Sequence, residues 1–230
     1  MLEIEVEFNG IKNTYLDLHC ISCGRRQRAE EQIVEYNIPD RDDEPTEHTG
    51  KYKPYLRPMK FAWKDKARTA EINKWLVGYG ELRTSKDPDG YFKANVVSGY
   101  DVEKFSRRYD EFQVQFKINP GFFYMDSGDD IIVMTAPGTI VNMGTISSEP
   151  YIKITGSGNI NLTINSTVYS FTAVDTYLQI DSELKYVYRD ALNQGDKMVG
   201  KFPVLAVGSN AISWTGTVTK IEVVPRWREQ

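Results

Sequence analysis

The chain has 230 residues, with 28 basic against 32 acidic side chains and a net charge of −4. This length suits one large or two small domains, and the balanced charge gives no general electrostatic reason to bind nucleic acid. No apolar run reaches the roughly 20 residues of a membrane helix, and the acidic, alternating start lacks the pattern of a secretion signal. We therefore expect synthesis in a cytoplasm, with neither nucleic acid nor membrane insertion among the interactions.

The first predicted element is a strand over residues 2–8, because apolar and acidic side chains alternate there. Asn9 and Gly10 follow, and both residue types accept the positive φ of a hairpin turn. Residues 11–18 are then predicted to form the return strand.

Cys20 and Cys23 are the only cysteines, and His19 and His48 are the only histidines. Zinc usually has four protein ligands in a structural site, and the chain has no second pair to complete a tetrahedron. A redox motif would need a helix start within a βαβ pattern, whereas strands are predicted on both sides. We expect ordinary reduced thiols in a turn, no metal site and no cofactor.

An acidic segment that contains proline and glycine, residues 39–50, separates two strand-like stretches at 31–38 and 52–63. This pattern predicts a long hairpin whose acidic tip is exposed. The tip is either a solvated loop or an arm that reaches a neighbouring subunit, and the residues alone favour the solvated loop.

One short helix is predicted over residues 65–76. Asp65 is a suitable N-cap, and Ile72, Trp75 and Leu76 share one apolar face. The alternating strand that contains Phe112, Val114 and Phe116 should then end at Asn119, Pro120 and Gly121, because proline donates no backbone hydrogen bond. Residues 1–120 therefore read as a β-rich α+β domain.

Residues 121–147 are predicted to connect this domain to a second one, residues 148–230. Short strands and turn signals recur there at regular intervals, which is typical of a β-sandwich. In the last strand, alternation predicts that Ile221 and Val223 point inward. The predicted fold class is mainly β.

Catalytic patterns are missing from the sequence. It contains no nucleophile elbow, no P-loop and no complete dinucleotide fingerprint. The adjacent pair Asp129 and Asp130 shows no sign of the opposed placement that glycoside hydrolysis requires. We expect no catalytic residues and no enzyme activity.

Several motifs, taken in their order, resemble the distal tail proteins of phages with long non-contractile tails. In the first half they are Ile72-x-x-Trp75-Leu76, Leu82, Asp89 to Ala94, and Phe112-x-Val114-x-Phe116 followed by Asn119-Pro120. In the second half they are Pro150 to Gly158, Phe202-Pro203-x-Leu205, Gly208 to Gly216, and Pro225 to Arg228. The resemblance spans nearly the whole chain.

The resemblance implies a virion structural protein of a phage or prophage, found at the distal end of the tail. Its N-terminal domain would form a homo-hexameric ring, and its C-terminal domain would be a galectin-like sandwich, similar also to carbohydrate-binding modules. The ring would join the tail tube protein to the tail-associated tip protein and carry a baseplate or a receptor-binding protein.

The resemblance also makes an arm over residues 36–56 the favoured interpretation of the acidic hairpin. The subunit contacts expected from this arm are Asp40, Asp42, Asp43, Glu44, Tyr52 and Tyr55.

The alternative function is a carbohydrate-binding module that grips sugars of the host cell wall. Exposed aromatic side chains with polar neighbours are typical of sugar sites, and the candidates here are Asn210, Trp214, Arg226, Trp227 and Arg228. Trp214 follows an alternating strand, so it could equally fill the core, and a galectin-like fold alone does not establish sugar binding.

Overall fold

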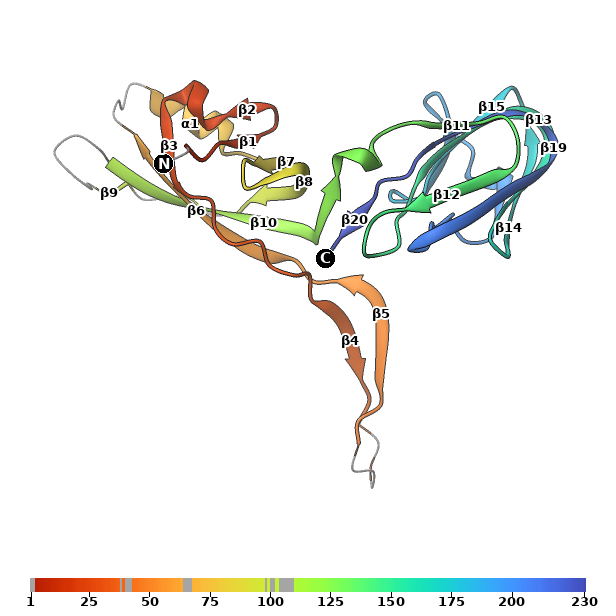
Figure 1. Cartoon of the computed structure of the whole chain (residues 1–230), viewed down its shortest axis with the longest axis horizontal. Helices are drawn as coiled ribbons and strands as arrows, with labels where there is room; N and C mark the ends of the chain where they lie inside the picture. The colour runs from red at the N-terminus through yellow and green to blue at the C-terminus, as the bar shows by residue number, and fades with distance from the viewer. Residues whose placement is uncertain are drawn as a thin grey trace. The chain divides into compact units, whose positions relative to one another are not determined.

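The computed structural model describes residues 3–37, 39, 43–63, 68–97, 99, 102–103 and 110–230 (Figure 1). The chain divides into two compact units, Met1–Phe123 with Gln230, and Tyr124–Glu229. Almost all regular structure is strand, with a single α-helix among the described residues. The mainly β class that the sequence predicted is confirmed. No helix in these ranges is long and apolar enough to cross a bilayer.

The first unit is built on one antiparallel sheet with the strand order β2-β1-β7-β8-β10-β6-β3. The strands are β1 (Val6–Phe8), β2 (Ile11–Lys12), β3 (Leu18–Ser22), β6 (Tyr55–Trp63), β7 (Tyr79–Thr84), β8 (Asp87–Val96) and β10 (Asp110–Met125), with β9 (Val102–Glu103) beside β10. A bridge between Ile4 and Cys20 brings the chain just before β1 against β3. The sheet therefore curls back on itself.

Strand β10 runs through the centre of this sheet. Phe112, Val114, Phe116 and Ile118 alternate inward and are buried, as the period of two requires. The strand does not end at Asn119 and Pro120, as the sequence predicted, but continues to Met125 through a cis peptide bond. Gly121 permits this passage, because a Cβ there would lie 2.4 Å from the carbonyl oxygen of Lys53.

The predicted helix is α1 (Thr69–Trp75), which buries Ile72 and Trp75. The Trp75 indole N–H donates to the Phe8 carbonyl at 3.2 Å, and its ring meets Phe61 edge-on at 5.6 Å. Trp75 is therefore a core residue. The predicted N-cap, Asp65, lies outside the described residues.

The return strand predicted over residues 11–18 is mostly a 3₁₀ helix, η1 (Asn13–Leu16). The buried side chain of Asn13 accepts the Val6 N–H at 2.7 Å and donates to the Leu18 carbonyl at 2.8 Å. These two bonds replace strand pairing and shorten β2 to two residues.

The second unit has the strand order β11-β19-β13-β15-β16-β17, with β12 on β19, β14 on β13 and β18 on β14. The strands are β11 (Ile132–Met134), β12 (Gly138–Asn142), β13 (Tyr151–Ile164), β14 (Thr167–Val174), β15 (Tyr177–Asp181), β16 (Tyr186–Arg189), β17 (Leu192–Asn193), β18 (Met198–Val199), β19 (Gly208–Val224) and β20 (Arg228–Glu229). Short 3₁₀ turns are η3 (Asp126–Gly128) and η4 (Gly195–Lys197).

The long strands β13 and β19 pair along both of their halves, with register shifts near Gly156 and between Ser157 and Asn161. Such bulges bend a strand and increase its twist. Glycines fit the close approach there, since a Cβ on Gly156 would lie 2.2 Å from the Thr217 carbonyl oxygen. The inner face encloses a core that includes Ile154, Phe171 and Ile221.

Two strands of the second unit come from the segment that the sequence suggested as a connector. β11 and β12 both pair with β19, and the boundary between the two units falls after Phe123. The reason is the apolar alternation of these short strands, whose Met134 and Ile140 are buried in the core of this unit.

Candidate assembly arm

The candidate site is a hairpin, which we call the arm, formed by β4 (Glu31–Glu35) and β5 (Thr46–Tyr52). These strands pair with each other and, among the described residues, with no further strand (Figure 1). The arm begins at Glu31 rather than near residue 36. Ile33 and Val34 are 43% and 41% exposed. An isolated two-stranded hairpin is marginally stable in water, so this hairpin is a candidate for contact with another chain.

Polar bonds across the arm hold its two strands in register. The Glu31 carboxylate lies 3.0 Å from His48 Nδ1 and accepts the Gly50 N–H at 3.1 Å. The bond with His48 is the main cause that lowers the pKa of Glu31. Tyr36 donates its hydroxyl to Glu47 at 2.6 Å, which raises the pKa of Tyr36. All of these groups are near solvent, so each bond stabilises the arm only slightly.

The root of the arm is attached to the end of β10. The ring of Tyr52 meets Phe122 edge-on at 5.4 Å, and the Lys53 N–H donates to the Glu30 carbonyl at 2.7 Å. Tyr52 and Tyr55 therefore lie at the root, where Tyr55 is the first residue of β6 and pairs with Ile118. Asp43 and Glu44 are exposed at the tip, whereas the predicted contacts Asp40 and Asp42 lie outside the described residues.

A buried arginine lies near the root, and our sequence reasoning missed it. Arg57 is 1% exposed; its Nε donates to the Cys23 carbonyl at 2.8 Å, and its Nη2 donates to Asp87 at 3.0 Å. Its guanidinium also lies over the Phe92 ring at 4.9 Å. The signal was present, because strand alternation puts Arg57 on the inward face with Met59.

The bond from Arg57 to the Cys23 carbonyl helps to fix the segment that leads into the arm.

The two cysteines are not suited to thiol chemistry. Cys20 and Cys23 are both buried, and neither forms a disulfide. Burial is the main cause that raises the pKa of Cys20 to about 12. A thiol with so high a pKa is a poor nucleophile at neutral pH.

The candidate sugar residues of the second unit do not form one exposed surface. Trp227 is 2% exposed in the core, and Asn210 is fully buried. The Asn210 amide donates to the Ala206 and Gly208 carbonyls at 2.8 and 2.9 Å. Trp214 is partly buried against the same core. Asn210 and Trp227 are thus used inside the sandwich, whereas Trp214 keeps part of its side chain exposed.

The two candidate arginines also have internal partners. Arg226 makes two 2.8 Å bonds to Asp181, and Arg228 donates to the Ser147 carbonyl at 2.6 Å from Nη2. Burial opposes ionisation of Asp181, but hydrogen bonds from Arg226 and from backbone N–H groups outweigh it, so the pKa of Asp181 is lowered. This ion pair ties the residue before Trp227 to β15.

The outer face of the second unit carries aromatic side chains that the sequence reasoning did not single out. Tyr186 and Tyr188 stack at 5.3 Å, Gln179 donates to the Tyr151 hydroxyl at 2.7 Å, and Lys153 lies over the Tyr177 ring at 4.7 Å. Register places these side chains on one face of β13, β15 and β16. Alternate tyrosines in short strands were the available signal.

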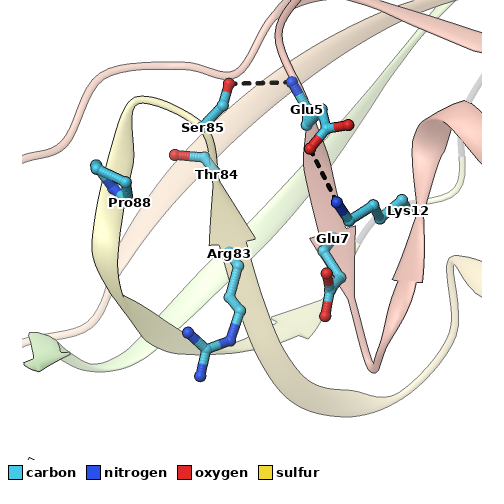
Figure 2. A pocket seen from close by; sticks show the side chains of 7 residues that line it. All are labelled: Glu5, Glu7, Lys12, Arg83, Thr84, Ser85 and Pro88. Atoms are coloured by element: carbon cyan, nitrogen blue, oxygen red, sulfur yellow. Dashed lines mark hydrogen bonds and ion pairs between the residues drawn. The ribbon is translucent and has the colours of Figure 1, made fainter. Parts of the chain in front are cut away.

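A shallow polar depression lies on the first unit at the turn between β7 and β8. Figure 2 shows its lining, which is Glu5, Glu7, Lys12, Arg83, Thr84, Ser85 and Pro88. Lys12 pairs with Glu5 at 3.0 Å, and the Glu5 N–H donates to Ser85 at 3.0 Å. The bond to Glu5 raises the pKa of Lys12. Since the Glu5 carboxylate is already paired with the Lys12 ammonium group, these two side chains do not resemble a catalytic acid–base pair.

The described residues contain no group of three or more His, Cys, Asp or Glu placed to hold a metal.

No protein-family model matches the sequence, and no curated protein matches it significantly. Two solved structures with a similar fold come from the hub and the baseplate of phages. One is Dit of phage SPP1, described as a paradigm of the hub adsorption apparatus in phages that infect Gram-positive bacteria. It has a TM-score of 0.71 and 11% identity, and the match covers 96% of this chain and 98% of that one.

A second is the baseplate of phage p2 in its activated conformation with Sr, with a TM-score of 0.51, 8% identity, and coverage of 96% and 97% of the two chains. At these identities the likeness concerns the fold. The distal-tail-protein fold that the motifs predicted is thus confirmed along almost the entire chain. Both neighbours are structural tail components rather than enzymes.

Proposed function

We propose that this chain is a structural protein of a phage tail, which acts as an assembly hub at the distal end of the virion. The observation that carries the proposal is the fold shared with the SPP1 hub protein over 96% of the chain. The arm also supports it, since a two-stranded hairpin that pairs with no further strand of the described residues is marginally stable by itself and suits a contact with another chain.

In this proposal the first unit forms a homo-hexameric ring, and the arm of each copy contacts the next copy around the ring. Repeated head-to-tail contacts close into a ring when their rotation permits. The ring joins the tail tube protein to the tail-associated tip protein, and the second unit faces a baseplate or receptor-binding protein.

We do not propose sugar binding through the five residues that the sequence suggested. Asn210, Trp227 and Arg228 are buried, and Arg226 is committed to Asp181. A surface made from them would require the sandwich to open.

Immunogold electron microscopy of virions from the phage that encodes this chain tests the proposal. Antibodies against the chain should label the distal end of the tail, and particles treated with pre-immune serum provide the control. Label on the capsid, label along the tail shaft, or unlabelled particles that contain no such chain by mass spectrometry would each contradict the proposal.

A further inference from the structure

The arm and its root carry opposite charges. Residues 31–50 contain one arginine against seven carboxylates. The flanking residues 24–30 and 51–53 contain five cations against one carboxylate, Glu30. The whole chain is close to neutral, so this separation is a local property of the hairpin and its attachment.

The acidic end is exposed and far from the root. Glu35, Asp43, Glu44 and Glu47 are all exposed in the outer half of the arm, which we call the acidic tip. The seven residues of β5 span about 20 Å at the usual rise of a strand. Strand pairing holds the hairpin extended, so the acidic tip cannot fold back on the root of its own chain.

The basic end is held in place before any partner arrives. The segment 24–28 has no strand partner in the described residues, but one of its own residues and the residues on both sides of it are held against the first unit. The Cys23 carbonyl accepts from Arg57, the Arg26 guanidinium lies 4.4 Å from the Phe123 ring centre, and Ala29 is 4% exposed. Preorganisation of this kind lowers the conformational entropy lost on binding.

All five cations of the root segments are exposed, and we call three of them, Arg25, Arg28 and Lys51, the basic root. Arg28 donates to the Gln230 side chain at 3.0 and 2.8 Å, which is a neutral amide and leaves the arginine charge uncompensated by that contact. Lys53, in contrast, already pairs with Glu30 at 2.6 Å.

We infer that the acidic tip of one copy docks on the basic root of a second copy. The inference rests on the proposed function, since it specifies where the arm binds on its neighbour. Two acidic tips repel each other, as do two basic roots, so charge selects tip-to-root contacts over symmetric tip-to-tip contacts. The resulting contact is heterologous, which is the type that builds rings.

Charge reversal tests the inference in the full-length chain. The tip variant carries Asp43→Lys and Glu44→Lys, and the root variant carries Arg25→Glu and Arg28→Glu. Self-association is measured by sedimentation equilibrium up to millimolar concentration in low salt. We expect each variant alone to associate at least about tenfold more weakly than the natural chain.

An equimolar mixture of the two variants is the decisive sample. The tip variant loses the net negative charge of its tip but keeps the natural basic root, whereas the root variant loses its basic root but keeps the natural acidic tip. Each should therefore bind the other although neither binds itself, which misfolding could not produce. The natural contact should weaken as salt is raised, because exposed charges are screened.

Two matched controls separate local charge from total charge. Asp130→Lys with Asp196→Lys makes the same net change as the tip variant on exposed sites of the second unit, and Arg25→Lys with Arg28→Lys keeps the root basic. Both should associate within about twofold of the natural chain if local charge decides.

Other results would overturn the inference. Unchanged association of both reversed variants contradicts it, and so does a natural chain that stays monomeric under these conditions. Deleting residues 32–50 distinguishes this failure from failure of the proposed function. If the deletion abolishes association while the reversals do not, and immunogold still labels the tail tip, the arm contacts its neighbour through other groups.

Discussion

Arg57 is a charged residue buried in the first unit. Its guanidinium is 1% exposed, and it lies 3.0 Å from an Asp87 carboxylate whose side chain is 12% exposed. Asp87 also accepts the Thr84 hydroxyl at 3.0 Å. A buried pair of this kind adds little net stability, but the loss of one partner leaves a desolvated charge.

We expect Arg57→Ala to lower the free energy of unfolding of the first unit by about 3 kcal/mol. The double variant Arg57→Met with Asp87→Asn removes both charges and should recover more than half of this loss. Urea denaturation followed by tryptophan fluorescence measures both values. A single variant that is as stable as the natural chain would show that Asp87 is solvated without Arg57.

Asp181 gives the second unit a dependence on pH. Hydrogen bonds from Arg226 and backbone N–H groups lower its folded-state pKa below the ordinary value of 3.8. A carboxylate with a depressed pKa stabilises the fold above its unfolded-state pKa, and this contribution disappears as pH falls through the folded-state pKa.

The variant Asp181→Asn should therefore be less stable than the natural chain by about 2 kcal/mol at pH 7. This difference should hold down to about pH 5 and shrink steadily below about pH 4. Thermal unfolding of both chains across this range measures it, with exposed Asp130→Asn as the control. A difference that does not change with pH would exclude the Asp181 charge as its cause.

At the scale of the element, the arm shows what a sequence can predict. Alternation and the acidic, proline-containing turn predicted a hairpin, and the structure has one at 31–52. Its root could not be predicted, because Tyr52 is held by Phe122, a residue far along the chain. Apolar patterning finds an element, but it does not identify its distant contacts.

The alternation of apolar side chains in β19 continues beyond the residues that we used for prediction. Alternation correctly predicted that Ile221 and Val223 are buried. Pro225 falls on the same face, and one further step places Trp227 there as well, which is where the structure has both. The candidate sugar residues came from the side chains that are typical of sugar sites, and strand periodicity was the better guide. The prediction that a strand ends at Asn119 and Pro120 was wrong for a different reason. A local rule about proline takes no account of the close approach of Gly121 to the Lys53 carbonyl, which lies far away in the sequence.

The variant Tyr52→Ala should loosen the arm without unfolding the first unit. An aromatic pair contributes about 0.5–1.5 kcal/mol beyond the area that it buries. Amide hydrogen exchange of β5 should therefore accelerate by about three- to tenfold, while exchange in β6 stays unchanged. Tyr15→Ala, at a side chain that is 66% exposed, is the matched control. Unchanged exchange in β5 would show that backbone pairing alone orders the arm.

On the scale of the whole molecule, each unit has its own core. The first is centred on aromatic residues of β6, β10 and α1, which include Phe61, Phe112 and Trp75. The second is mostly aliphatic and includes Trp227, which is 2% exposed. Since each unit has its own hydrophobic core, we expect each unit to unfold in a transition of its own.

We expect Trp227→Ala to separate these transitions in calorimetry. Truncating a buried tryptophan typically costs about 3–5 kcal/mol, and only the second unit should bear this cost. Its melting temperature should fall by roughly 10 °C or more for a unit of about 100 residues, while the other transition stays in place. Val204→Ala, a partly exposed position in the same unit, should shift the same transition only slightly. If Trp227→Ala moved both transitions together, the two units would unfold as one cooperative body, and the first unit would depend on the second for its stability.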